Sequence, residues 1–297
     1  MKKIPLFFIL LFISCSHLGK PNAYSYTIKY ALENRIAYID EGNGIPIIFN
    51  HAWTFDLRYF EESFLYFIKK GFRVIAYDLP GHGLSKKEDY AYTATFYGKV
   101  LSDFIKELNL ENPVLIGNSL GGLLIIRSIL DYNLKSRAIV LVSSTGMIQY
   151  TPKMIKALSY MVTRKDFMNP ATFKLKEWLS DFLLDNDKIE IWEKRYLSTM
   201  ESPEFSLYKN AIVKTFIKIK ENDGYIADKL NKIDIPALII WGSRDAFYFP
   251  SYGEEICKKI KNSKFELIEN AGHLPMVDAP DAFNKKVYNY LKERLNL

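Results

Sequence analysis

The sequence predicts an α/β protein with a mostly parallel, doubly wound sheet and an inserted helical cap. Short apolar runs recur along the chain with apolar residues on both parities, which is typical of strands covered on both faces. Segments with helical spacing separate these runs. The alternation is interrupted once, between about residues 147 and 232, by a segment rich in Trp, Tyr, Phe and Lys.

The predicted elements follow one another in a regular order from Tyr26. A first strand at 35–39 ends at the turn sequence Glu41-Gly42-Asn43-Gly44. The core strands are the runs 45–49, 73–77, 114–116, 138–142, 237–241 and 265–268. Apolar residues share one helical face in two segments: Phe96, Val100, Phe104, Ile105 and Leu108, and then Phe283, Val287, Tyr290, Leu291 and Leu295.

These patterns divide the chain into three parts. Residues 1–20 form a signal or anchor segment, residues 25–146 and 233–297 form the sheet domain, and residues 147–232 form the cap. Pro152, Pro170 and Pro203 predict about four short helices in the cap. Because strands precede and follow this segment, an insertion into the sheet domain is favoured over a separate helical domain.

Composition excludes several classes of protein. The chain has 297 residues, of which 48% are hydrophobic and 25% charged, so it can bury a large core and is not a disordered protein. Its net charge of +6 is dispersed without a basic stripe, which argues against a nucleic-acid partner. Cys257 is the one cysteine besides Cys15, so no internal disulfide is expected. No metal-ligand spacing is present, and we expect no metal or other cofactor.

The N-terminus has the build of an export signal. Lys2 and Lys3 precede an apolar segment at 4–13 that is too short to span a bilayer comfortably. The following Ser14-Cys15 resembles a bacterial lipoprotein signal, although Phe12 stands where that pattern usually has Leu. We therefore expect an exported protein anchored to a membrane surface by a lipid on Cys15. The alternatives are a periplasmic protein, an uncleaved anchor and a buried helix.

Chemically active residue types follow the predicted core strands. In open α/β sheets, ligands bind beyond the carboxyl ends of the strands. One such segment is Gly117-Asn118-Ser119-Leu120-Gly121, which fits the pattern G-x-S-x-G of a nucleophile on a sharp strand-to-helix turn. Side chains at Gly117 and Gly121 would collide with the neighbouring strand and helix. The pentapeptide alone is a weak signal, because other glycine-rich turns match it.

A base and an orienting acid follow Ser119 in the sequence. His273 comes after the last strand, and Asp245 comes directly beyond the run 237–241. Taken alone, His273 could be a loop histidine that caps a carbonyl, and Asp245 a surface carboxylate. Asp278 competes with Asp245 but follows His273 by only five residues. The order Ser119, Asp245, His273 is the order of an α/β-hydrolase triad.

Together these motifs resemble an α/β-hydrolase-fold serine hydrolase of the capped, carboxylesterase-like kind. The resemblance covers residues 36–295 except the cap, and includes the His51 loop and the segment 78–85. It implies that the backbone N–H groups of Trp53 and Leu120 form an oxyanion hole, supported by the loop of His51. The family usually has Gly where this chain has Ala52, which puts the loop's geometry in question because Ala disfavours positive φ.

The resemblance implies a serine hydrolase that cleaves a small to medium apolar carboxylic ester through an acyl-enzyme. A carbon–carbon bond hydrolase of ring-fission type is the second interpretation, although those enzymes usually have a glycine-rich oxyanion loop and an aromatic residue after the histidine. A perhydrolase or acyltransferase is a third. A catalytically inactive, surface-anchored binding module is the alternative outside enzymes. The sequence gives no oligomeric state.

Overall fold

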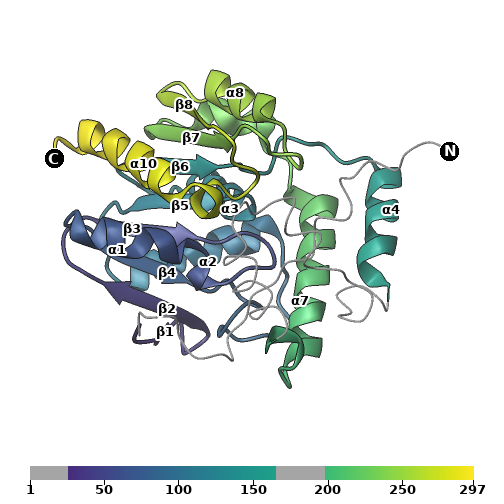
Figure 1. Ribbon diagram of the computed structural model, residues 1–297. Helices are drawn as coiled ribbons and strands as arrows, with labels where there is room; N and C mark the ends of the chain where they lie inside the picture. Colours follow the sequence, from purple (N-terminus) through teal and green to yellow (C-terminus); the bar gives the residue numbers. More distant parts are fainter. Residues whose placement is uncertain (1–25, 165–197) are drawn as a thin grey trace.

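The computed structural model describes residues 26–164 and 198–297 (Figure 1). Cys15, the predicted signal segment and the cap residues 165–197, with Pro170 among them, lie outside the described residues. Among the helices that are described, none combines the length and apolarity needed to span a membrane.

An eight-stranded sheet forms the centre of the molecule, with the strand order β1-β2-β4-β3-β5-β6-β7-β8. The six strands from β4 to β8 in this order are parallel, whereas β1 and β2 pair antiparallel at one edge. The predicted α/β fold with a mostly parallel sheet is therefore confirmed. The strands are β1 (Lys29–Ala31), β2 (Ile36–Glu41), β3 (Pro46–Asn50), β4 (Arg73–Tyr77), β5 (Val114–Asn118), β6 (Ile139–Val142), β7 (Ala237–Gly242) and β8 (Ser263–Ile268).

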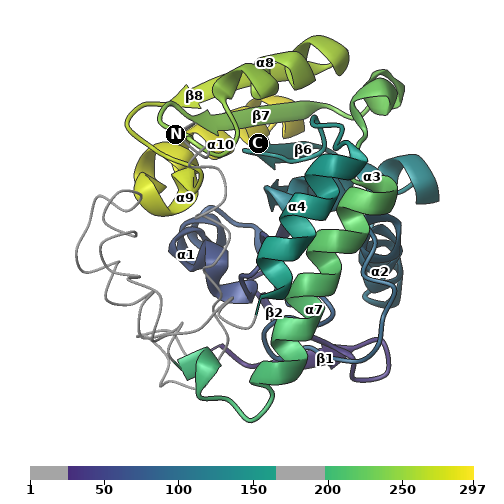
Figure 2. The same cartoon turned by 90° about the vertical axis from the view of Figure 1, so that its right-hand side faces the viewer.

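Helices cover both faces of this sheet, as Figures 1 and 2 show. On one face, α1 (Glu61–Lys69) packs beside α10 (Pro280–Leu295). On the other face, α2 (Ala94–Glu107) packs closely against α3 (Leu120–Tyr132), and α8 (Pro250–Lys259) covers β7 and β8. Shorter segments are η2 (Leu57–Phe60) and α9 (Pro275–Asp278).

Two hydrophobic cores result, one on each face of the sheet. In β4, Val74 and Ala76 join the core under α1 and α10, whereas Ile75 and Tyr77 join the core under α2 and α3. Successive strand residues point to opposite faces, so a strand buried on both faces must be apolar at every position. This is why the core strands read as continuous apolar runs.

Four described elements occupy the segment between β6 and β7. They are α4 (Pro152–Thr163), α7 (Phe205–Lys218), the π-helical turn η4 (Ile219–Asp223) that continues α7, and the 3₁₀ helix η5 (Ala227–Lys232). Pro152 is the first residue of α4, where a missing N–H costs nothing, and Thr151 caps that helix through Met154 N. Helices α4 and α7 lie side by side (Figure 2). The residue limits of the predicted domains stay a prediction.

Candidate active site

Ser119 lies in a strained turn between β5 and α3. Its backbone has φ 52° and ψ −112°, a left-handed value that non-glycine residues rarely adopt. Its N–H donates to Val142 O at 2.9 Å, and its carbonyl accepts from Thr145 N at 3.1 Å. These bonds hold the turn against the neighbouring strand β6. The residue is 9% exposed, whereas its neighbour Asn118 is fully buried.

Glycine is required on both sides of this turn. A Cβ on Gly117 would lie 2.5 Å from the backbone of Gly121 in α3. A Cβ on Gly121 would lie 2.2 Å from the carbonyl oxygen of Asn50 in β3. Real Cβ atoms do not approach backbone atoms this closely. The close packing of β5, α3 and β3 that presents Ser119 therefore depends on these two glycines.

Asp245 and His273 are hydrogen bonded to each other. The imidazole Nδ1 of His273 lies 2.8 Å from Asp245 Oδ2, and the Asp245 side chain is fully buried. The other oxygen, Oδ1, accepts from the backbone N–H groups of Phe247 at 2.9 Å and Tyr248 at 3.0 Å. These two N–H donors hold the Asp245 carboxylate in place, so that its Oδ2 can accept a hydrogen bond from the imidazole. Nδ1–H is thus donated to Asp245, which leaves Nε2 as the basic nitrogen.

Asp278, the competing carboxylate, supports the loop of His273 instead. Its Oδ2 accepts from the backbone N–H of Gly272 at 2.7 Å. A second glycine lets this loop approach the sheet, because a Cβ on Gly242 would lie 2.0 Å from the carbonyl oxygen of Gly272. No local sequence pattern indicated this role for Gly242. Its place at the end of β7, directly before Asp245, is the signal that could have found it.

Asn118 connects the turn of Ser119 to the loop of His273. Its side-chain Nδ2 donates to the backbone oxygens of His273 and Val142, both at 3.1 Å, and its Oδ1 accepts from the Tyr59 hydroxyl at 2.8 Å. The two loops come from distant parts of the sequence, so no sequence pattern revealed this contact. Among the hydrogen bonds of the described residues, none joins Ser119 Oγ to His273. Catalytic hydrogen bonds are often long before substrate binds.

Trp53 and His51 lie in the loop after β3, on the other side of the Ser119 turn. The Trp53 indole donates to Ile212 O of α7 at 3.0 Å, and its ring lies 4.9 Å from that of Phe216. Ala52 does not take a positive φ; Thr54, with φ 75°, does so instead. The loop therefore accommodates Ala52 without a left-handed backbone at that position.

The N–H groups of Trp53 and Leu120 have no hydrogen-bond acceptor within the described ranges. Leu120 is the first residue of α3, where helix N–H groups lack intrahelical partners and the helix dipole favours negative charge. The strand order puts Ser119, at the end of β5, next to the end of β3. This arrangement can supply two donors to an oxyanion, which is the role the resemblance implied.

His51 is a neutral structural residue. Its Nδ1–H donates to Ala52 O at 2.8 Å, and its Nε2 accepts from Leu79 N at 3.0 Å. Burial lowers the pKa of His51 to about 4, because a charged imidazole would lose its hydration there. The ring therefore joins the loop after β3 to the loop after β4 without charge, as expected of a supporting residue.

No metal centre is evident in the part of the chain that the structure describes. There, no three or more His, Cys, Asp or Glu side chains gather in an arrangement that could hold a metal ion.

Residues 45–280 match the family model described as alpha/beta hydrolase fold, and the chain therefore belongs to this family. Among curated proteins, it is 24% identical to 2-hydroxy-6-oxo-6-(2'-aminophenyl)hexa-2,4-dienoic acid hydrolase of Metapseudomonas resinovorans, over 88% of each chain. It is likewise 24% identical to the AB hydrolase superfamily protein YisY of Bacillus subtilis, over 84% of this chain and 93% of that protein.

Solved structures show the same fold. An esterase from Exiguobacterium antarcticum superposes with a TM-score of 0.74 at 21% identity, covering 90% of this chain and all (100%) of that one. A thermophilic esterase from Thermogutta terrifontis superposes with a TM-score of 0.72 at 22% identity, covering 87% and 93%.

Proposed function

We propose that the protein is a serine hydrolase that cleaves a small to medium, largely apolar carboxylic ester. The hydrogen bond between Asp245 and His273 carries this proposal, because it fixes an imidazole in a loop whose backbone contacts Asn118, the residue before Ser119 on its strained turn. Two solved relatives of the same fold bear the name esterase, which is consistent with the proposal but says nothing of this chain's substrate.

The mechanism follows from the polarity of these groups. His273 Nε2 takes the proton of the Ser119 hydroxyl as its oxygen attacks the ester carbonyl. Asp245 keeps Nδ1 protonated and stabilises the imidazolium. The N–H groups of Trp53 and Leu120 receive the negative charge on the carbonyl oxygen. His273 then protonates the departing alcohol, and water attacks the acyl-enzyme by the same route to release the acid.

A carbon–carbon bond hydrolase is the second candidate, because a curated relative that matches 88% of this chain is named as the hydrolase of a 2-hydroxy-6-oxo-dienoic acid. Here water would cleave a vinylogous diketone at the same site. A perhydrolase or acyltransferase would use the same acyl-enzyme with another acceptor. An inactive binding module would have to retain Ser119, Asp245 and His273 without using them.

The experiment is covalent labelling by a fluorophosphonate, followed by turnover assays. We expect the probe to label the wild type and not Ser119→Ala. Equal labelling of both proteins, or labelling of neither, would refute serine hydrolysis. Hydrolysis of short p-nitrophenyl esters in preference to a vinylogous diketone supports the esterase; the reverse preference supports the carbon–carbon hydrolase.

For the N-terminus, we propose export and anchoring to a membrane surface by a lipid on Cys15. The basic tip, the short apolar segment and the cysteine after Ser14 support this. Replacing Cys15 by Ser should release the protein from membranes. Unchanged membrane association would favour an uncleaved anchor.

A further inference from the structure

Lys220 is a cation beside the candidate active site that the proposed mechanism does not use. It lies in the π-helical turn η4, which continues α7. Its Nζ lies 4.0 Å from the centroid of the Phe216 ring and 4.7 Å from that of Tyr150. These are cation–π distances. Lys220 is half-buried, and loss of hydration lowers the pKa of its ammonium to about 7.

The two rings connect Lys220 to both sides of Ser119. On one side, the Phe216 ring lies 4.9 Å from Trp53 of the oxyanion loop. On the other side, the Tyr150 hydroxyl lies 3.3 Å from that of Tyr248, whose ring stacks 5.9 Å from His273. The loop of Trp53 follows β3, which pairs with β5, and the backbone oxygen of His273 accepts from Asn118 at the end of β5. The ammonium is therefore held on the cap side of the triad.

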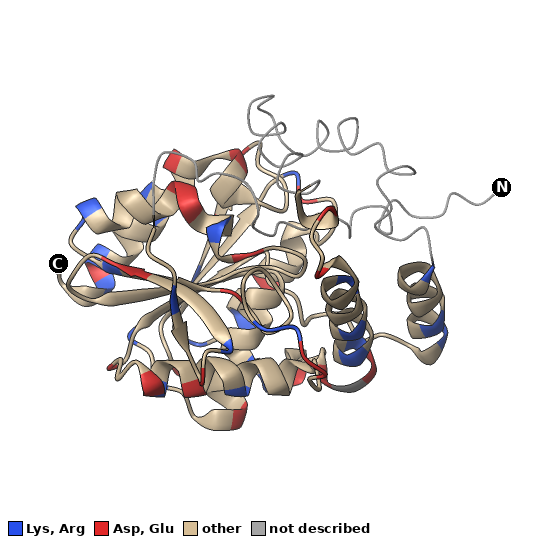
Figure 3. Ribbon diagram, turned by 90° about the horizontal axis from the view of Figure 1, so that it is seen from below, with Lys and Arg blue, Asp and Glu red and all other residues tan. Residues whose placement is uncertain are grey.

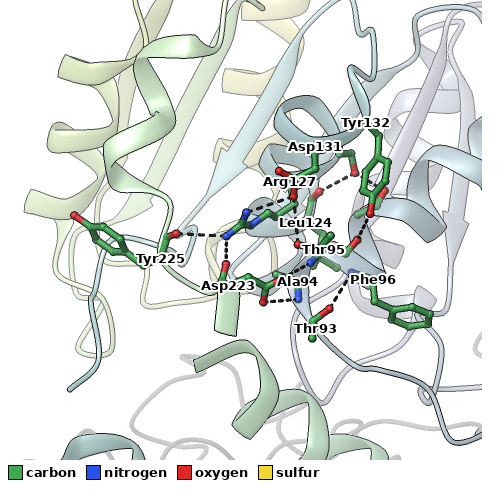
Figure 4. A network of polar contacts seen from close by, with 12 residues as sticks. Thr93, Ala94, Thr95, Phe96, Leu124, Arg127, Asp131, Tyr132, Asp223 and Tyr225 are labelled. Atoms are coloured by element: carbon green, nitrogen blue, oxygen red, sulfur yellow. Dashed lines mark hydrogen bonds and ion pairs between the residues drawn. The ribbon is translucent and has the colours of Figure 1, made fainter. Parts of the chain in front are cut away.

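The carboxylates nearest to Lys220 in the sequence are engaged elsewhere. Glu221 lies 3.5 Å from Lys218. Asp223 accepts from the backbone N–H groups of Ala94 at 2.9 Å and Thr95 at 2.6 Å, in the network of Figure 4. Within the described ranges, no carboxylate lies at ion-pair distance from Lys220.

An ammonium shielded from water without a counter-ion is costly, and aromatic faces compensate for only part of this cost. The Asp223 network fastens the end of η4 to α2 and α3, which restricts how far Lys220 can move toward bulk water (Figure 4). An anion supplied by a ligand would complete the site.

The cap helices around Lys220 also favour an anion. Helices α4 and α7 carry five lysines and no acidic residue, although Lys214 pairs with Asp89 and Lys218 with Glu221 outside these helices. Both helices show blue segments in Figure 3. Surface charges of one sign raise the local concentration of ligands of the opposite sign. The sheet domain in the same view mixes both signs.

We propose that Lys220 binds a carboxylate carried by the substrate, so that the substrate is the ester of a dicarboxylic acid. Its chain is apolar, one end is the ester that Ser119 attacks, and the other end is a free carboxylate. The proposal rests on the proposed function, because Lys220 selects among esters only if Ser119 cleaves them. The apolar chain of such an ester would lie among the aromatic side chains, and its free carboxylate would pair with the ammonium of Lys220.

The kinetic test compares matched ester pairs. Monomethyl adipate and methyl hexanoate have the same chain length and differ in the terminal carboxylate; monomethyl glutarate and methyl pentanoate form a shorter pair. Methanol release gives kcat/KM for each. We expect Lys220→Met to lower the ratio of acidic to neutral ester by roughly tenfold to a hundredfold, as for loss of a charge-assisted hydrogen bond. Lys218→Met, at an exposed lysine two residues earlier that pairs with Glu221, should leave the ratio unchanged.

A binding test separates failure of this proposal from failure of the proposed function. In Ser119→Ala protein, calorimetry should show adipamic acid binding at least about tenfold more tightly than hexanamide. Adding Lys220→Met to Ser119→Ala should abolish this difference in affinity. If the Lys220→Met protein does not fold, Lys220→Gln replaces it in the same experiment. Equal binding with and without Lys220 overturns the proposal. Equal fluorophosphonate labelling of wild type and Ser119→Ala overturns the hydrolase proposal instead, and the binding result still stands.

Discussion

The contact between Asn118 and the His273 loop makes a testable prediction about how the site is assembled. Asn118→Ala removes three hydrogen bonds: two buried bonds, donated to Val142 O and accepted from Tyr59, and one partly buried bond donated to His273 O. Val142 O keeps the bond from Ser119 N at 2.9 Å. At about 1 to 2 kcal/mol per bond, we expect the three losses together to lower the free energy of unfolding by about 3 to 6 kcal/mol.

The same variant should slow the chemistry of Ser119. Without Asn118, the His273 loop is no longer tied to the nucleophile turn, and a shift of about 1 Å costs about a hundredfold in rate. The assay is the rate of fluorophosphonate labelling, which needs no knowledge of the substrate. Urea unfolding measures the stability in parallel.

Tyr59→Phe is the matched control. It removes one of the three bonds but leaves the contact between Asn118 and His273, so it should cost about 1 to 2 kcal/mol and leave the labelling rate unchanged. If Asn118→Ala loses stability but labels as fast as Tyr59→Phe, the reasoning is refuted, and Asn118 is only a buried structural residue.

Three further predictions concern the triad, the cap cation and the glycines. Asp245→Asn should lower the labelling rate by about 10⁴, because an amide donates to His273 and selects the wrong tautomer; an unchanged rate would exclude the triad. The pKa of Lys220 in the folded state is about 7, against an ordinary value of 10.5. Between these two pH values the folded state binds fewer protons than the unfolded state. The free energy of unfolding of the wild type should therefore fall as pH is lowered from about 10 to 7. Lys220→Met should therefore be more stable than wild type at pH 7 by about 1 to 3 kcal/mol in urea unfolding, with the difference shrinking toward pH 10; destabilisation at pH 7 would indicate a structural cation. Gly121→Ala should fail to fold or lose more than about 3 kcal/mol in the free energy of unfolding, because its Cβ would lie 2.2 Å from a backbone carbonyl oxygen. Gly71→Ala is the control: a Cβ there has no atom within 4 Å, so thermal or urea unfolding should show a loss of only about 1 kcal/mol.

Much of the fold was predictable from local patterns. Strands buried on both faces must be apolar at every position, and the runs at 73–77 and 237–241 match β4 and β7 closely. The short strand β1 (Lys29–Ala31) was not predicted, because three residues with mixed exposure carry no periodic signal. The antiparallel pairing of β1 and β2 likewise depends on contacts that sequence spacing does not encode.

By itself, the sequence determined the residue types of the candidate site and their order in the chain. The glycines on both sides of Ser119 indicated a sharp strand-to-helix turn at that residue. The sequence also indicated that Asp245 and His273 lie at the carboxyl ends of the strands, where ligands bind in open α/β sheets. Only the tertiary structure decided that Asp245, and not Asp278, contacts the imidazole. Such choices depend on through-space contacts between segments far apart in the chain. For the same reason, only the fold brings Lys220 over the rings of Phe216 and Tyr150.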